Sequence, residues 1–278
     1  MKPFDFTAGE AAERHTVVLL HSSASSSRQW NALAELLRPR YDVLTVDFHG
    51  HGTRAAWHGA RPLTLADEVA LVEPILQEAG SVHLVGHSYG GAVALKLVDL
   101  HPQSVRSLVV YEPVLFNWLF RHEPDSPAAQ QAIELADSMR ERLERGDAYA
   151  AAEQFIGYWA GPSAWLRMGG AKRDSTALRM RSVLAHFGAL SREPLARLRL
   201  AGPLVPMLCL GGSDTAASTR RIATLLRQAF PLAQHATLDS LGHMGPITHP
   251  TAVNARIATF LSALPEEQGL DERLKTTA

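Results

Sequence analysis

One serine of the chain lies in a sequence context that suits nucleophilic chemistry. Ser88 is the central residue of Gly-His-Ser-Tyr-Gly, between an apolar, β-branched run at 82–85 and a helical pattern that continues to Leu100. A sharp strand-to-helix turn strains the backbone of its central residue and lifts the side chain above the edge of the sheet. Gly86 and Gly90 remove the collisions that larger neighbours would cause there. A glycine-rich turn with a solvated serine is the alternative, but the position between strand and helix favours a nucleophile.

A serine hydroxyl needs a base within hydrogen-bond reach, and a carboxylate must orient that base. Asp214 follows the apolar run 205–210, at the carboxyl end of a predicted strand, where the catalytic groups of open parallel sheets gather. His243 lies on a glycine-flanked loop before the last predicted helix. We therefore predict Ser88 as nucleophile, His243 as base and Asp214 as acid, in the chain order of the nucleophile-elbow enzymes.

Other polar residues compete for these roles. Glu112 also follows a strand end and is the alternative acid, whereas Asp239 is too close in sequence to His243. The pair His49 and His51 has the spacing of a zinc-binding motif but lacks spaced carboxylate ligands behind it. We predict no metal and no cofactor.

The elements that must position these residues follow from the hydrophobic periodicity. Short β-branched runs alternate with helical patterns, which is typical of a mostly parallel, doubly wound α/β sheet buried on both faces. The predicted strands cover 16–20, 43–46, 82–85, 105–111, 205–210 and 235–238. The predicted helices cover 29–37, 64–79, 89–100, 217–229 and 250–263, with Pro74 expected to kink the second or to move its boundary.

One segment interrupts this alternation. Residues 114–194 contain no convincing strand, and Ser126-Pro127 opens a helical pattern that Gly146 ends. We predict a helical cap at 114–194, inserted into a core formed by 1–113 and 195–278. The segment holds 9 of the 19 aromatic residues, so we expect Trp118 and Trp159, with Met244 from the core, to line an apolar binding pocket.

Composition excludes several classes of protein. The 278 residues include 27 basic and 28 acidic side chains, a balance that argues against a nucleic-acid partner or an anionic membrane surface. The single cysteine, Cys209, lies in an apolar run and permits no internal disulfide. Neither a signal peptide nor a run of eighteen apolar residues is recognisable, so we expect a soluble, cytoplasmic protein that acts on a small molecule. The oligomeric state is left open.

With these motifs, the chain resembles the α/β-hydrolase superfamily over roughly residues 16 to 264. Three further stretches match family patterns: Val-Leu-Leu-His-Ser-Ser at 18–23, Asp-Phe-His-Gly-His-Gly-Thr at 47–53, and Tyr-Glu-Pro at 111–113. The resemblance implies an oxyanion hole formed by the backbone N–H groups of Ser23 and Tyr89. Ser22 stands where glycine is commoner, so the first donor could shift by one residue.

The predicted chemistry is acyl transfer to water, which suits an ester or thioester of a small, largely apolar substrate. The superfamily also contains C–C bond hydrolases that act on ring-cleavage products with the same three residues. Their acidic substrates need a cationic anchor, which cap arginines such as Arg121, Arg167, Arg179 and Arg181 could provide. A hydroxynitrile lyase, an acyltransferase or a non-catalytic ligand receptor on this fold are further alternatives.

Overall fold

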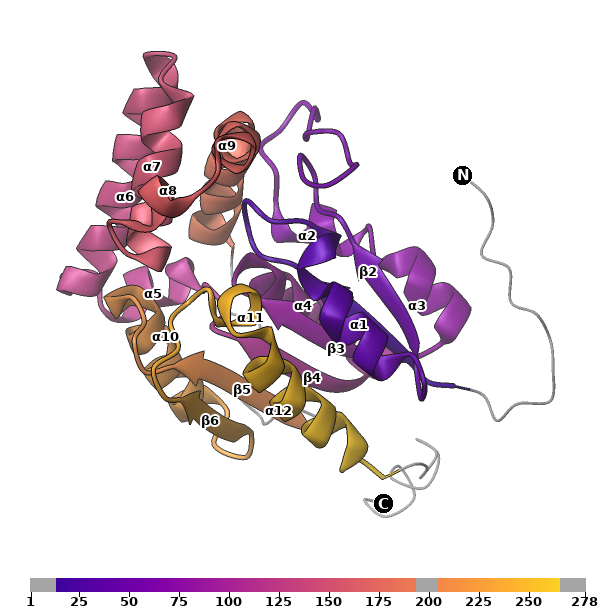
Figure 1. Cartoon of the computed structure of the whole chain (residues 1–278). Helices are drawn as coiled ribbons and strands as arrows, with labels where there is room; N and C mark the ends of the chain where they lie inside the picture. Colours follow the sequence, from indigo (N-terminus) through magenta and orange to yellow (C-terminus); the bar gives the residue numbers. More distant parts are fainter. Residues whose placement is uncertain (1–13, 194–204, 266–278) are drawn as a thin grey trace.

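The computed structural model describes residues 14–193 and 205–265, and its centre is a parallel sheet (Figure 1). The six strands lie in the order β2-β1-β3-β4-β5-β6, and every neighbouring pair is parallel. Their bounds are Thr16–Leu20 for β1, Asp42–Val46 for β2, Val82–His87 for β3, Val105–Tyr111 for β4, Met207–Gly212 for β5 and Gln234–Leu238 for β6. The six predicted strands are therefore confirmed to within two residues at each end.

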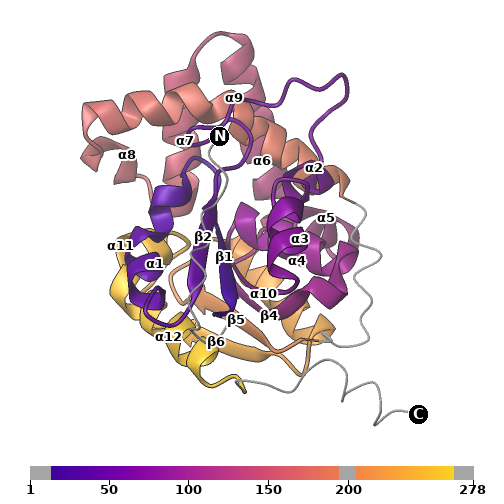
Figure 2. The ribbon, with the colours of Figure 1, turned by 90° about the vertical axis from the view of Figure 1, so that its right-hand side faces the viewer.

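Helices cover both faces of the sheet (Figure 2). On one face lie α1 (Asn31–Leu37), after a 3-10 turn at Ser27–Trp30, and α12 (Pro250–Ser262). On the other lie α3 (Glu73–Ala79), α4 (Tyr89–Leu100) and α10 (Ala217–Ala229). Alternate side chains of β1 enter the two cores, with Val17 and Leu19 in one and Val18 and Leu20 in the other. This double burial explains the continuous apolar runs of the strands and confirms the predicted doubly wound α/β architecture.

The helix predicted over 64–79 is two helices. The first, α2 (Leu65–Val69), begins with a capping box in which Thr64 and Asp67 satisfy each other's backbone N–H groups. Pro74 lies in the first turn of α3, where its missing N–H costs no helical hydrogen bond. The proline therefore begins a new helix and does not bend a continuous one.

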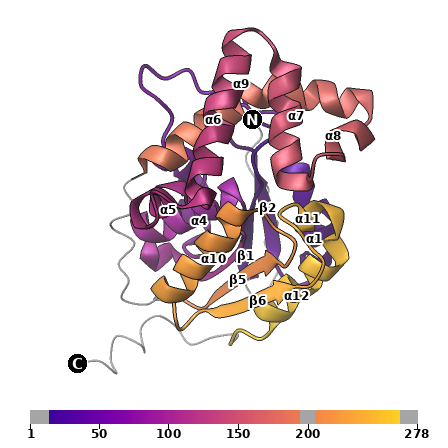
Figure 3. The same cartoon turned by 90° about the vertical axis from the view of Figure 1, so that its left-hand side faces the viewer.

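The described residues between β4 and β5 form helices joined by loops and no strand, and most of these helices lie above one end of the strands (Figure 3). Their bounds are Phe116–His122 for α5, Pro127–Glu144 for α6, Ala148–Ala160 for α7, Ala164–Arg167 for α8 and Gly170–Arg192 for α9. We call residues 114–193 the cap. As predicted, α6 begins after Ser126, whose Oγ accepts the N–H of Ala129, and it ends before Gly146. The predicted end of the cap at 194 lies outside the described residues.

Two short helical segments complete the fold: a 3-10 turn at Pro102–Ser104 and α11 at Gly245–Thr248. Among the helices within 14–193 and 205–265, none is both long and apolar enough to cross a membrane.

Candidate active site

Ser88 occupies a strained turn between β3 and α4. Its φ of 55° and ψ of −116° lie in a region that residues with a β-carbon rarely adopt. A β-carbon at position 90 would clash with the carbonyl oxygens of Leu20 and His21, at the end of the neighbouring strand β1. Gly90 thus permits the close approach that the turn requires. The hydroxyl of Ser88 stands at the amino end of α4, where N–H groups and the helix dipole favour negative charge.

His243 reaches Ser88 from the loop between β6 and α11. Its Nε2 lies 2.9 Å from the Ser88 Oγ, and the two residues are 2% and 5% exposed. Two hydrogen bonds hold the loop in place. His87 Nε2 donates to the backbone carbonyl of His243 at 2.8 Å, and the hydroxyl of Tyr111 donates to the carbonyl of Gly242 at 2.8 Å. The predicted nucleophile and base, 155 residues apart in the chain, are therefore in hydrogen-bond contact.

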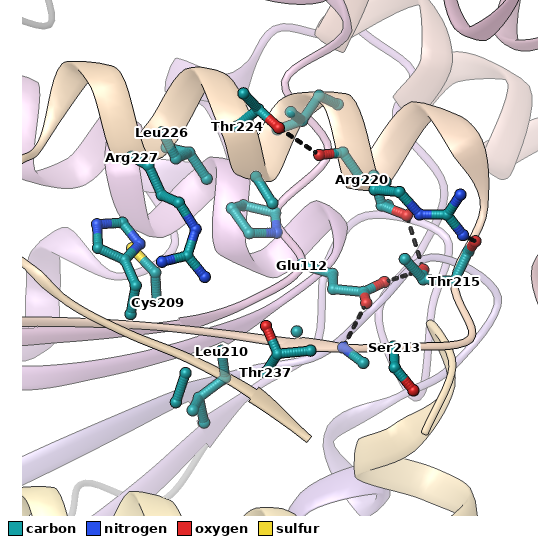
Figure 4. A pocket seen from close by; sticks show the side chains of 18 residues that line it. Glu112, Cys209, Leu210, Ser213, Thr215, Arg220, Thr224, Leu226, Arg227 and Thr237 are labelled. Atoms are coloured by element: carbon teal, nitrogen blue, oxygen red, sulfur yellow. Dashed lines mark hydrogen bonds between the residues drawn. The ribbon is translucent and has the colours of Figure 1, made fainter. Parts of the chain in front are cut away.

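The carboxylate beside His243 belongs to Glu112 at the end of β4. Its Oε2 lies 2.8 Å from Nδ1 of His243. The same Oε2 accepts the Thr215 hydroxyl at 2.6 Å, while Oε1 accepts the N–H of Gly212 at 2.8 Å (Figure 4). Burial alone would raise the pKa of Glu112. The hydrogen bonds from His243, Thr215 and Gly212 lower it instead, and the net pKa lies below its usual value. Glu112 is thus an ionised carboxylate that can orient the imidazole.

The structure corrects the assignment of Asp214 as the acid. Both ring nitrogens of His243 are engaged by Glu112 and Ser88, and the exposed carboxylate of Asp214 accepts the hydroxyl of Ser213 at 3.1 Å. The reason lies in the loop after β5. The backbone N–H of Asp214 donates to Leu241 at 2.9 Å, while the same loop uses Gly212 and Thr215 to hold the Glu112 carboxylate. Sequence reasoning missed these two donors, because a glycine N–H and a threonine hydroxyl carry no distinctive signal.

The predicted oxyanion donors lie on loops that follow adjacent strands, because Ser23 follows β1 and Tyr89 follows β3. In the described part of the chain, the backbone N–H groups of Ser23 and Tyr89 have no hydrogen-bond acceptor. Those on either side of Ser23 are occupied: the N–H of Ser22 donates to Gln29 at 3.1 Å and the N–H of Ala24 donates to His51 at 3.0 Å. A donor shifted by one residue is therefore disfavoured, and Ser23 remains the predicted donor.

A cavity of about 410 Å³ adjoins the site on the side of the cap. Two of the three predicted binding residues, Trp159 and Met244, line it, and the ring of Trp159 stacks on the imidazole of His243 with centroids 4.1 Å apart. The third, Trp118, does not line it. Trp118 is a buried residue that stacks on Phe230 between α5 and α10, and its role in binding stays a prediction. Among the described residues that line this cavity, Asp214 is the one with a charged side chain.

A second cavity, of about 300 Å³, is lined by Glu112 and by residues of β5, β6 and α10 (Figure 4). It is lined by Cys209, Arg227 and Thr237 among others. Burial raises the pKa of the Cys209 thiol to about 12, which agrees with an unreactive core cysteine.

Comparison with known proteins places this arrangement in a family. The model of the alpha/beta hydrolase family matches residues 17–256. A pimeloyl-[acyl-carrier protein] methyl ester esterase of Yersinia pseudotuberculosis is 26% identical over 249 residues, which cover 88% of this chain and 92% of that protein.

Solved structures agree in fold. A hydrolase from Pseudomonas aeruginosa is 27% identical, with a TM-score of 0.71 and coverage of 91% of this chain and 92% of that one. An alpha/beta hydrolase enzyme from a Medee basin deep-sea metagenome library has a TM-score of 0.76 at 17% identity, with coverage of 96% and 95%. At that identity the likeness concerns the fold alone. These matches identify the chain as a hydrolase.

Proposed function

Because the chain belongs to the alpha/beta hydrolase family, we propose that it is a serine esterase that cleaves carboxylic esters through an acyl-enzyme. The observation that carries this proposal is the continuous hydrogen-bonded series from Ser88 through His243 to Glu112, with contacts of 2.9 and 2.8 Å. The name of the Yersinia pseudotuberculosis relative, a methyl ester esterase, supports an ester as the substrate.

In the proposed mechanism, the Ser88 Oγ attacks the ester carbonyl carbon while Nε2 of His243 takes the hydroxyl proton. Glu112 holds the Nδ1–H and stabilises the imidazolium that forms. The N–H groups of Ser23 and Tyr89 bind the oxyanion of the tetrahedral intermediate. His243 then gives its proton to the leaving alkoxide, and the acyl group stays on Ser88. Water, deprotonated by His243, attacks this acyl-enzyme, and His243 returns the proton to the Ser88 Oγ as the carboxylic acid leaves.

The cavity beside Trp159 indicates the kind of substrate. Trp159 and Met244 offer apolar surface next to the imidazole, which suits a small, largely apolar ester or thioester. The C–C bond hydrolase alternative requires an anionic substrate and hence a basic anchor. Within 14–193 and 205–265, the residues that line this cavity include Asp214 and no basic residue, so the observations favour the esterase.

A fluorophosphonate probe with intact-mass measurement tests the proposal. We expect wild type to gain one adduct and Ser88→Ala to gain none. Ser213→Ala, which removes an exposed hydroxyl close to the site, is the matched control and is expected to react like wild type. A wild-type protein that stays unlabelled and hydrolyses no p-nitrophenyl ester would overturn the proposal.

A further inference from the structure

One cap side chain contacts both residues that are predicted to form the oxyanion hole. His186, in α9, is fully buried, and its Nδ1 lies 2.8 Å from the Oγ of Ser23. The same imidazole stacks on the ring of Tyr89 with centroids 3.7 Å apart and an interplanar angle of 2°. The side chains of Ser23 and Tyr89 are thus held by a residue of the cap, while their backbone N–H groups have no acceptor among the residues that the structure describes.

The other face of His186 supports the next residue of the same loop. Its ring stacks on His51 at 4.6 Å between centroids, and Nε2 of His51 accepts the N–H of Ala24. Ala24 has a φ of 60°, a left-handed conformation that costs free energy for a residue with a β-carbon. Contacts from outside the loop must therefore maintain the turn at Ser23 and Ala24. The stacked pair of His186 and His51 provides them.

The position of His186 depends on how closely α9 lies against the core. A β-carbon at Gly50 would clash with the side chain of Ser182, so α9 contacts the backbone of the loop after β2 directly. Ser182 and His186 are four residues apart and share one face of the helix. The close contact at Gly50 thus directs His186 toward Ser23.

Burial also sets the protonation state of His186. It holds the pKa of the imidazole well below its usual value, so the ring is neutral near pH 7. Its Nε2 faces Oε1 of Glu68 at 3.6 Å. Nε2 makes no hydrogen bond with any described residue; in the tautomer that carries the proton on Nε2, Nδ1 accepts the Ser23 hydroxyl. In that tautomer the Ser23 hydroxyl donates to His186 of the cap.

We propose that His186 is a positioning residue: by packing α9 of the cap against the core, it couples the position of the cap to the orientation of the two N–H donors of the oxyanion hole. With the cap seated, His186 fixes the loop of Ser23 from one side and the ring of Tyr89 from the other. It touches no reacting atom and acts through the orientation of two N–H donors. The inference rests on the proposed serine esterase function.

The test separates the hydrogen bond of His186 from its packing. His186→Phe keeps a flat ring between Tyr89 and His51 but offers Ser23 no acceptor. Loss of an oxyanion donor costs about 10²–10³-fold in kcat, so a displaced donor is expected to lower kcat and kcat/KM by roughly 10- to 100-fold with KM little changed. The rate of fluorophosphonate labelling should fall in parallel. His186→Asn keeps a polar atom near the position of Nδ1 and is expected to recover most of the loss.

Two further comparisons make the result specific. Ser23→Ala should lower kcat like His186→Phe, and the double variant should be no slower than either single one, because both changes remove the same contact. Thr176 is another buried polar residue of α9, and its hydroxyl donates to the backbone carbonyl of Lys172. Thr176→Val removes this hydrogen bond and should lower the midpoint of unfolding without changing kcat.

The possible failures are distinguishable. If wild type neither hydrolyses esters nor reacts with the probe, the esterase proposal itself is wrong. If wild type reacts and His186→Phe reacts within twofold of it, the coupling is refuted, even where the variant unfolds more easily. If His186→Phe does not fold, unchanged kinetics of Ser23→Ala refute it equally.

Discussion

Replacing Glu112 by glutamine tests the assignment of the acid, because it keeps the shape of the side chain and removes its charge. In the structure, Oε1 accepts the N–H of Gly212 and Oε2 faces Nδ1 of His243. A glutamine that keeps its carbonyl oxygen on Gly212 directs its NH₂ group toward His243. Nδ1 must then act as an acceptor, the ring proton moves to Nε2, and the imidazole can no longer take the proton of Ser88.

The size of the effect follows from the lost charge. The imidazolium formed during the reaction would sit about 4 Å from the carboxylate charge, an interaction of about 4 kcal/mol at an effective dielectric constant of 20. That corresponds to a fall in kcat of about 10³-fold. Asp214→Asn is the matched control, since its carboxylate is exposed and contacts Ser213. We expect it to change kcat by less than about threefold, in line with the small effect of exposed charges.

The assay is hydrolysis of p-nitrophenyl esters by both variants at pH 8, with circular dichroism to confirm folding. A fall of about 10³-fold for Asp214→Asn, with Glu112→Gln within tenfold of wild type, would refute the assignment. It would mean that the loop after β5 rearranges during turnover and exchanges one carboxylate for the other.

Three further outcomes are expected. Burial raises the pKa of Glu68 from 4.5 to about 7. The native state therefore binds more protons than the unfolded state between these values, and wild type loses up to about 3 kcal/mol of stability as the pH rises through them. Glu68→Gln should escape this loss, so a stability difference from wild type that is equal at pH 5 and pH 8 in urea unfolding would contradict the reasoning. Trp159→Ala removes the ring stacked on His243, and it should lower kcat/KM for p-nitrophenyl acetate about tenfold while raising the ratio of octanoate to acetate hydrolysis; an unchanged ratio would remove Trp159 from the binding site. Ser88→Gly should be about 1 kcal/mol more stable than Ser88→Ala, the reverse of the usual order, because the φ of 55° favours glycine; equal unfolding midpoints would mean that the elbow stores no strain.

The features that sequence predicted correctly are those that neighbouring residues specify. The apolar runs mark strands buried on both faces, and Ser126-Pro127 marks the start of α6, because side-chain burial and backbone geometry act over a few residues. Gly90 marks the turn around Ser88 for the same reason. His243 was identifiable as well, since it lies on a glycine-flanked loop between the last strand and the last helices.

Choices between similar residues were decided only by the tertiary structure. Glu112 and Asp214 both follow strand ends, but Gly212 and Thr215 of the neighbouring strand and its loop hold the Glu112 carboxylate beside His243. Trp118 and Trp159 both lie on cap helices, but only α7 turns its tryptophan toward the imidazole. His186 had no distinguishing sequence context. Its role follows from contacts across 163 residues of chain, because a distance in space between packed elements is not encoded in any local pattern.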